Sequence, residues 1–83
     1  MINISEVDFK KLKGLIPVII QEEENLQILM LGIMNETALK KTLEENIVTF
    51  WSRTRKSLWT KGETSGNYLK VKDILFDCDK DTL

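Results

Sequence analysis

The spacing of apolar and polar positions changes along the chain, and the changes predict its elements. Residues 15–21 form an apolar run rich in β-branched side chains, and residues 26–34 form a second one. Two such runs, separated by the polar residues 22–25, are typical of strands joined as a hairpin. Pro17 lacks a backbone N–H, so we expect it at a sheet edge or a bulge, and Gly32 is expected to mark a bulge or a close approach.

Helical spacing follows the second run. Asn35 is a good N-cap, and Leu39 and Leu43 recur four residues apart, on one face of a helix. Asn46 tolerates the left-handed conformation that often ends a helix. The sequence therefore predicts a helix from about residue 36 to residue 45.

Strands are expected again after the helix. The pattern predicts a third strand over 47–53, a short fourth over 57–60, a loop over 61–67 and a long final strand over 68–77, while the structure of 1–13 is left open. Strand, strand, helix and further strands in this order indicate an α+β domain. We expect a small β-rich domain with a mixed or antiparallel sheet and one main helix.

Length and composition narrow the class of protein. Eighty-three residues suffice for one domain, spanning 1–83, which is marginally stable alone. The single Cys78 rules out an internal disulfide and suits a reducing compartment, so a cytoplasmic location is expected. We find no signal peptide and no apolar run of the roughly 20 residues that a membrane span needs. A net charge of −1 argues against a general nucleic-acid binder.

Charge is unevenly distributed along the chain. Residues 52–72 carry six Lys or Arg and one Glu, whereas residues 73–83 carry four Asp and one Lys. A basic segment followed by an acidic one would suit an anionic substrate beside a divalent cation. From charge alone, a patchy solvated surface is the simpler interpretation.

The acidic segment has a pattern that suits metals. If residues 77–81 are extended, Asp77, Asp79 and Asp81 share one face, and Cys78 lies on the other. Carboxylates favour Mg²⁺ or Ca²⁺ and a thiolate favours Zn²⁺. However, carboxylates two residues apart on a flat strand lie roughly 6.5 Å apart, too far to converge without a curl. A calcium loop is disfavoured because Thr82 stands where glycine is needed, and composition alone fits an acidic tail equally well.

Two segments suit an anionic ligand. The loop from Lys61 to Asn67 offers glycines, hydroxyl groups and a cation to a phosphate, although an ordinary turn is the simpler interpretation. The basic segment 52–56 lies between Trp51 and Trp59, and arginine with tryptophan suits a nucleotide or single-stranded nucleic acid. We expect Trp51 in the core and Trp59 in a site.

Taken together and in order, these segments resemble one enzyme family, that of phosphoribosyl-AMP cyclohydrolase in histidine biosynthesis. The resemblance covers about residues 9–83, and its most specific part runs from Trp59 to Asn67. The matching segments are Gly14–Ile19, Met30–Gly32, Met34–Asn35, Ala38–Leu39, Thr42–Leu43, Trp51–Arg55, Leu58–Asn67, Asp77–Asp79 and Asp81–Leu83.

The resemblance implies a reaction and its cofactors. Zinc-bound water attacks C6 of the purine of phosphoribosyl-AMP, and the C6–N1 bond then breaks. It implies that Cys78 is a zinc ligand and that Asp77, Asp79 and Asp81 hold Mg²⁺. It also implies an intertwined homodimer and a small nucleotide substrate, with no role for nucleic acid or a membrane.

The resemblance also implies which residues of this chain bind the substrate. Arg53, Lys61, Ser65 and Gly66 are expected to bind phosphate, Trp59 to contact the base or ribose, and Glu63 to transfer a proton or orient the substrate. The full set expected to bind substrate is Ser52, Arg53, Trp59, Lys61, Gly62, Thr64, Ser65, Gly66 and Asn67.

The chain departs from the family pattern at its zinc ligands. Family members carry two further cysteines beyond the acidic motif, the first followed by histidine, whereas this chain ends at Leu83 with one cysteine and no histidine. Since zinc takes three or four ligands, we expect an incomplete domain that pairs with a second copy, and fusion to a pyrophosphohydrolase domain stays open. The alternatives are a non-catalytic module binding nucleotide or single-stranded RNA, and a structural domain binding divalent cations.

Overall fold

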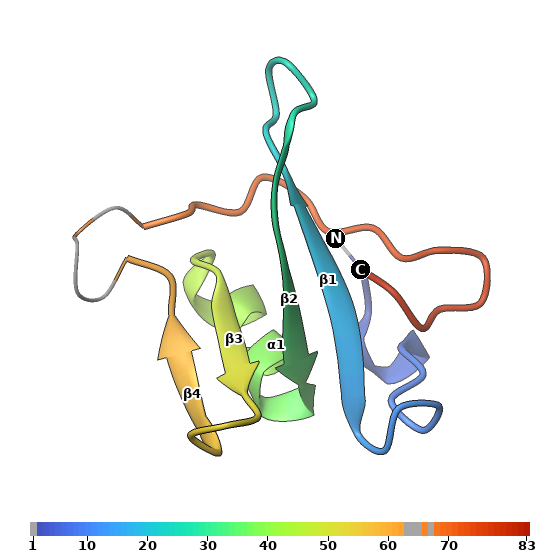
Figure 1. Ribbon diagram of the computed structural model, residues 1–83. Coiled ribbons are helices and arrows are strands. Elements are labelled where there is room, and N and C mark those ends of the chain that lie inside the picture. The colour runs from blue at the N-terminus through green and yellow to red at the C-terminus, as the bar shows by residue number, and fades with distance from the viewer. Residues whose placement is uncertain (1, 63–65, 67) are drawn as a thin grey trace.

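Two antiparallel hairpins and one α-helix form the framework of the chain (Figure 1). The computed structural model describes residues 2–62, 66 and 68–83. The elements are the short 3₁₀ helix η1 (Ile4–Glu6), strands β1 (Leu15–Gln21) and β2 (Ile28–Asn35), helix α1 (Glu36–Glu45), and strands β3 (Thr49–Ser52) and β4 (Ser57–Thr60). This arrangement confirms the predicted α+β class and its antiparallel pairing.

The first hairpin follows the sequence pattern closely. Strand β1 has the predicted bounds, and β2 begins at Ile28, two residues later than expected. The register pairs Ile16 with Met34 and Val18 with Gly32, and it shifts after Ile20. Pro17 lies in β1 with its carbonyl on the outer edge, where it accepts the N–H of Leu83 at 3.0 Å. The predicted edge position of this proline is therefore confirmed.

Helix α1 has the predicted bounds and both predicted caps. The side chain of Asn35 accepts the backbone N–H of Ala38 at 2.8 Å, which satisfies one of the free donors of the first turn. Asn46 ends the helix in the left-handed conformation, with φ 57°. Within the described part of the chain, no helix is long and apolar enough to cross a membrane.

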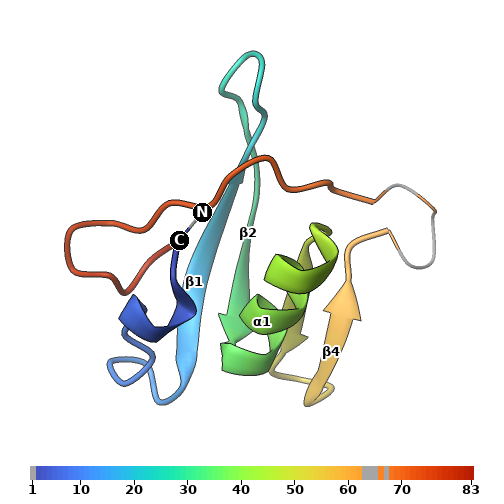
Figure 2. The ribbon, with the colours of Figure 1, turned by 180° about the vertical axis from the view of Figure 1, so that it is seen from behind.

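Helix α1 lies over one face of the hairpins, as Figure 2 shows from behind, and the core lies between them. Ile16 and Val18 of β1, Leu39 of α1 and Phe50 of β3 are almost completely buried there. The ring of Phe50 packs directly on the backbone of Gly32, where a Cβ atom would overlap it. The expected close approach at this glycine is thus confirmed, and it brings β3 against β2.

The predicted long strand over 68–77 is wrong. Its pairing is confined to one isolated bridge between Lys70 and Ile47, beside the start of β3. The backbone then runs irregularly across the helix side of the first hairpin, where Ile74 and Phe76 pack on the core. Some of its apolar side chains are therefore partly buried although its backbone forms no strand after Lys70.

The last residue, Leu83, forms hydrogen bonds with the outer edge of β1. Leu83 donates its N–H to the carbonyl of Pro17, and its own carbonyl accepts the N–H of Ile19 at 2.9 Å. These two bonds flank Val18 in the manner of a parallel ladder. The outer edge of β1 is therefore partly covered by a segment distant in sequence.

Candidate functional site

The basic segment forms the turn between β3 and β4. Ser52 ends β3, and its hydroxyl oxygen accepts the backbone N–H of Arg55 at 3.2 Å and lies 3.3 Å from the hydroxyl of Thr54. This hydroxyl, expected to bind substrate, therefore shapes the turn. Arg53 and Lys56 are exposed on the same turn, so it presents several cations to solvent.

A cavity of about 360 Å³ adjoins this turn and contains two of the expected substrate residues. Phe50 and Trp59 face one another across β3 and β4, with ring centroids 5.1 Å apart and ring planes inclined by 38°. Arg53 brings a guanidinium group to a cavity whose walls are otherwise mainly apolar. The lining residues are Leu31, Gly32, Ile33, Phe50, Trp51, Arg53, Thr54 and Trp59.

Of the two tryptophans, Trp51 is not where the sequence predicted it. Trp59 is half-buried, packs against the core and also lines the cavity, and its role in a site stays a prediction. Trp51 was expected in the core, but it is also half-buried and lines the same cavity. Phe50, which is 1% exposed, takes the core position on β3, whereas its neighbour Trp51 stays partly accessible.

The expected phosphate loop begins beside β3. The N–H of Lys61 donates to the carbonyl of Val48 at 3.1 Å, and Gly62 is buried with φ 95°. Gly66 also has a positive φ, of 81°, and donates its N–H to the carbonyl of Gly62 at 2.6 Å. Both glycines therefore use a conformation that other residues rarely adopt. The expected site residues Glu63, Thr64, Ser65 and Asn67 lie outside the described residues.

The acidic segment is a turn, so the extended arrangement considered for it is wrong. The N–H of Lys80 donates to the carbonyl of Asp77 at 3.0 Å, and Lys80 has φ 60°. The N–H of Asp81 donates to Oδ1 of Asp77 at 3.2 Å. A turn removes the strict alternation of side chains. Hydrogen bonds within the segment shape this turn, and the segment belongs to no strand.

Lys11 supplies the counter-charge for this turn. Its Nζ lies 3.0 Å from Oδ2 of Asp81 and 3.9 Å from Oδ2 of Asp79. The hydrogen bond from Lys11 lowers the pKa of the Asp81 carboxyl, and the same bond raises the pKa of Lys11. Both shifts favour the charged forms, so the pair stays ionised near neutral pH.

These donors do not, as arranged, fit the metals that the family resemblance implies. Among the described residues, no three acidic or cysteine side chains lie close enough together to hold a metal ion. Cys78 is exposed, and it is the single cysteine of a chain with no histidine. Four-coordinate zinc therefore cannot be completed by thiolate and imidazole groups of this chain alone.

The cavity and the acidic turn lie on different sides of the first hairpin. Strands β3 and β4 lie beside β2, whereas the acidic turn lies beyond β1 next to the N-terminal segment (Figures 1 and 2). The backbone contact of 2.7 Å between the N–H of Asp8 and the carbonyl of Lys80 places the turn there. One copy of the chain therefore does not bring its aromatic cavity and its carboxylates together.

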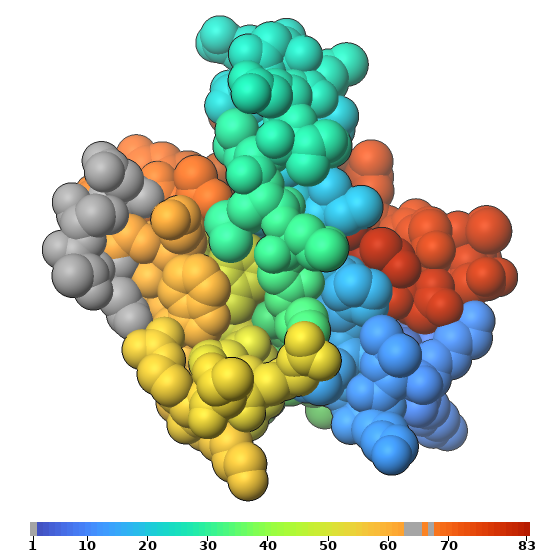
Figure 3. Space-filling model, in the orientation of Figure 1, coloured from blue at the N-terminus to red at the C-terminus, as the bar shows by residue number. Residues whose placement is uncertain are grey.

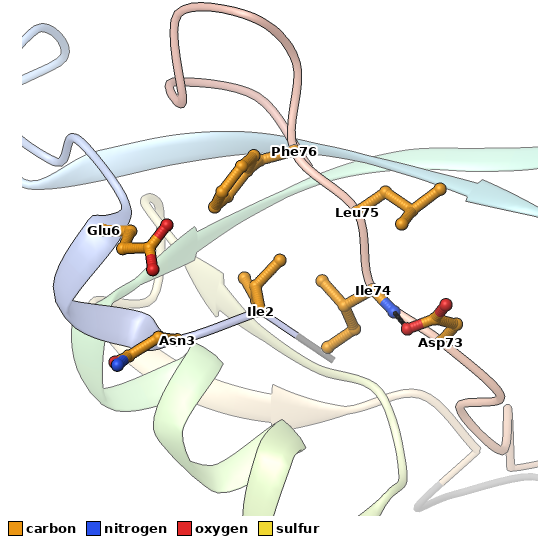
Figure 4. A pocket seen from close by; sticks show the side chains of 7 residues that line it. All are labelled: Ile2, Asn3, Glu6, Asp73, Ile74, Leu75 and Phe76. Atoms are coloured by element: carbon orange, nitrogen blue, oxygen red, sulfur yellow. Dashed lines mark hydrogen bonds between the residues drawn. The ribbon is translucent and has the colours of Figure 1, made fainter.

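A second cavity, of about 370 Å³, contains none of the expected site residues (Figure 4). It lies between the N-terminal segment and residues 73–76. Apolar side chains form most of its wall, and the carboxylates of Glu6 and Asp73 lie on either side. One of these carboxylates, that of Glu6, already pairs with the ammonium of Lys80 at 3.6 Å. This cavity is therefore a weaker candidate for substrate binding than the one that contains Arg53.

Comparison with known proteins identifies the family. A family model described as phosphoribosyl-AMP cyclohydrolase matches residues 30–83. The chain belongs to this family. The matched residues include the whole lining of the aromatic cavity and the acidic turn, whereas Lys11 lies outside them. The family is one of hydrolases, and its membership supports an enzymatic role for the chain.

Close relatives of the chain are bifunctional proteins. It is 57% identical to the histidine biosynthesis bifunctional protein HisIE of Haemophilus influenzae, over 98% of the chain and 37% of that protein. Identity is 59% to the protein of the same name from Escherichia coli K12, over 94% of the chain and 38% of the relative. The chain thus spans less than two fifths of the length of these relatives.

Sequence reasoning missed part of this site. Phe50, Trp51 and Leu31 line the cavity, although their apolar character indicated only a core or a strand. Gly32 was a usable signal, because a glycine in a strand indicates close packing. Lys11 gave no signal, since its partners lie about seventy residues away in the sequence.

Proposed function

We propose that this chain belongs to the machinery that opens the adenine ring of phosphoribosyl-AMP by hydrolysis in histidine biosynthesis. Water adds its oxygen to C6 of the purine, and the C6–N1 bond breaks while N1 gains a proton. The observation that carries the proposal is the cavity that joins Arg53 to Trp59 in a chain of this family. The family match supplies the class of reaction.

The cavity supports a specific placement of the substrate. Its volume of about 360 Å³ falls within the range typical of small-molecule sites. We propose that the purine lies against Trp59 and that the guanidinium of Arg53 binds a phosphate through paired hydrogen bonds. Lys61 begins the next loop and is not among the residues that line the cavity. Glu63, in that loop, is our candidate for proton transfer.

We propose that the acidic turn provides metal ligands after rearrangement. Asp77, Asp79 and Asp81 would hold Mg²⁺, and Cys78 would be one ligand of Zn²⁺, with further thiolate or imidazole ligands from outside these residues. Bound zinc supplies a water molecule with a pKa of about 7. A reducing compartment such as the cytoplasm would keep Cys78 available as a ligand.

A homodimer would resolve the separation of the two parts of the site. In one copy the acidic turn and the aromatic cavity lie on different sides of the first hairpin. A second copy on the uncovered face of that hairpin could place its acidic turn beside the first copy's cavity. We therefore propose that a complete site takes residues from two chains.

The test is hydrolysis of phosphoribosyl-AMP, followed by absorbance in the presence of Zn²⁺ and Mg²⁺. It compares this chain with a polypeptide of the length of its bifunctional relatives. We expect Arg53→Gln and Trp59→Leu to lower kcat/KM in whichever form is active, by about tenfold or more, because each removes a proposed substrate contact.

Arg55→Gln is the matched control. It makes the same change two residues away on the same turn, at a residue that does not line the cavity. If Arg53→Gln and Arg55→Gln lowered kcat/KM equally, the cavity would not be the substrate site. Tight binding of phosphoribosyl-AMP or RNA without hydrolysis in either form would instead favour a non-catalytic binding module.

A further inference from the structure

Gly32 provides the space into which the ring of Phe50 packs. It is paired with Val18 across the first hairpin, and Val18 is 4% exposed in the core. Residues directly opposite one another on paired strands point to the same face of the sheet. A side chain at position 32 would therefore enter the core, where the ring of Phe50 from β3 lies instead.

This space admits no larger residue at position 32. A Cβ atom there would come within 3.0 Å of Cδ1, Cε1 and Cζ of the Phe50 ring. At that separation the atoms would overlap, so the ring would have to move. Gly32 lies in a regular strand pair and its φ is not positive. The requirement for glycine is therefore one of space and not of backbone conformation.

Phe50 transmits this constraint to Trp59. The two residues are paired directly across β3 and β4, and their ring centroids lie 5.1 Å apart. Phe50 is 1% exposed and packs in the core, whereas Trp59 is only half-buried. Because a core is closely packed, a displaced Phe50 ring would push against Trp59, the more accessible neighbour. Gly32 thus acts on Trp59 through one side chain.

We infer that Gly32 is a positioning residue for the substrate: by seating the ring of Phe50, it fixes the place of the Trp59 ring in the cavity. The inference rests on the proposed placement of the purine against Trp59. Gly32, Phe50 and Trp59 all line the cavity. Contacts between aromatic rings depend on their offset and inclination. A displaced Trp59 ring would therefore bind a purine less well.

Fluorescence of Trp59 tests this inference without requiring hydrolysis. Trp51→Phe leaves Trp59 as the single tryptophan of the chain, and every variant is compared in that background. We expect Gly32→Ala to make Trp59 more accessible to quenching by acrylamide in the absence of ligand. The affinity for AMP, followed by the same fluorescence, should fall about fivefold, which corresponds to the loss of one aromatic contact.

Phe50→Leu distinguishes positioning from a general loss of packing. Alone, it leaves a gap beside Trp59 and should also weaken AMP binding. The methyl group of Gly32→Ala fills part of that gap, so the double variant should bind AMP more tightly than either single variant. Such compensation requires direct coupling between the two positions. If Gly32→Ala does not fold alone, the comparison of Phe50→Leu with the double variant still decides the question.

Val18→Ala is the matched control. It removes volume from the residue paired with Gly32, at a position that does not line the cavity. It should lower the stability to urea but leave Trp59 quenching and AMP affinity unchanged. Gly32→Ala with the same behaviour, or a double variant no better than the single ones, would overturn the inference. If the wild type bound no AMP, the placement of the purine would fail, whereas acrylamide quenching of Trp59 would still judge its positioning by Gly32.

Discussion

The side chain of Thr42 connects helix α1 to the second hairpin through its hydroxyl group. This side chain is 1% exposed, and its oxygen accepts the N–H of Thr49 at 3.0 Å. The hydroxyl lies 2.9 Å from the carbonyl of Ala38 and 3.2 Å from that of Thr49, so it can donate to either. A buried backbone N–H needs such a partner, and here a helix side chain provides it.

Thr42→Val should therefore destabilise the chain. Valine has nearly the same shape but leaves the N–H of Thr49 buried without a partner. We expect the free energy of unfolding to fall by about 1–3 kcal/mol, measured by urea denaturation. Thr37→Val, at an exposed position of the same helix, should change it by no more than about 0.5 kcal/mol. Equal effects of the two substitutions would contradict this role of the hydroxyl.

Residue types alone identified part of the candidate site. Arg53 and Trp59 were chosen because guanidinium and indole groups suit phosphates and purines, and both line the cavity. Trp51 was misplaced because its apolar neighbours indicated a buried strand. Which of two adjacent aromatic residues faces the core depends on the register of β3 against β4, and this register follows from pairing across the sheet.

Among the elements, helix α1 was predicted with its bounds and both of its caps because its signals are local. Capping involves residues within four positions of each other, so sequence suffices to recognise it. The helix also carries Leu39 into the core and begins directly at the end of β2. The position of the first turn of α1 therefore sets where the helix packs on the core relative to the end of β2.

Asn35→Ala should weaken this start. It removes the acceptor for the N–H of Ala38, and the expected loss is about 1 kcal/mol. For a domain of this size such a loss lowers the midpoint of thermal unfolding by about 4–8 °C, which circular dichroism can measure. Asn35→Asp keeps an acceptor and should retain most of the stability. A chain with alanine that unfolds at the wild-type temperature would show that the cap contributes little.

In the whole molecule, one face of the first hairpin carries apolar side chains that no described helix or strand covers. Helix α1 covers the opposite face, and the uncovered one is seen in Figure 3. Ile19 and Leu31 are paired across this face and are 48% and 68% exposed. Exposed apolar groups in register are typical of surfaces that contact another protein, which supports the proposed homodimer.

Ile19→Lys should prevent self-association of the chain. A charge at the centre of an apolar interface loses its hydration there without gaining a partner. Sedimentation velocity across a range of concentrations should show dimers for the wild type and monomers for the variant. Leu75→Lys is the control, because Leu75 is 74% exposed but lies far along the chain, beside the second cavity. A wild type that remains monomeric at every concentration would rule out the dimer.

Local signals were enough to predict strand β1, the capped helix α1 and the short strand β4, and the order of motifs was enough to predict the enzyme family. Tertiary structure alone decided the path of residues 68–83, the position of Trp51 and the partner of the acidic turn. Each of these depends on contacts between distant parts of the chain, such as Leu83 on β1 and Lys11 on Asp81. Local patterns express what a segment can form, whereas the neighbours that satisfy its hydrogen bonds and charges are known only once the chain has folded.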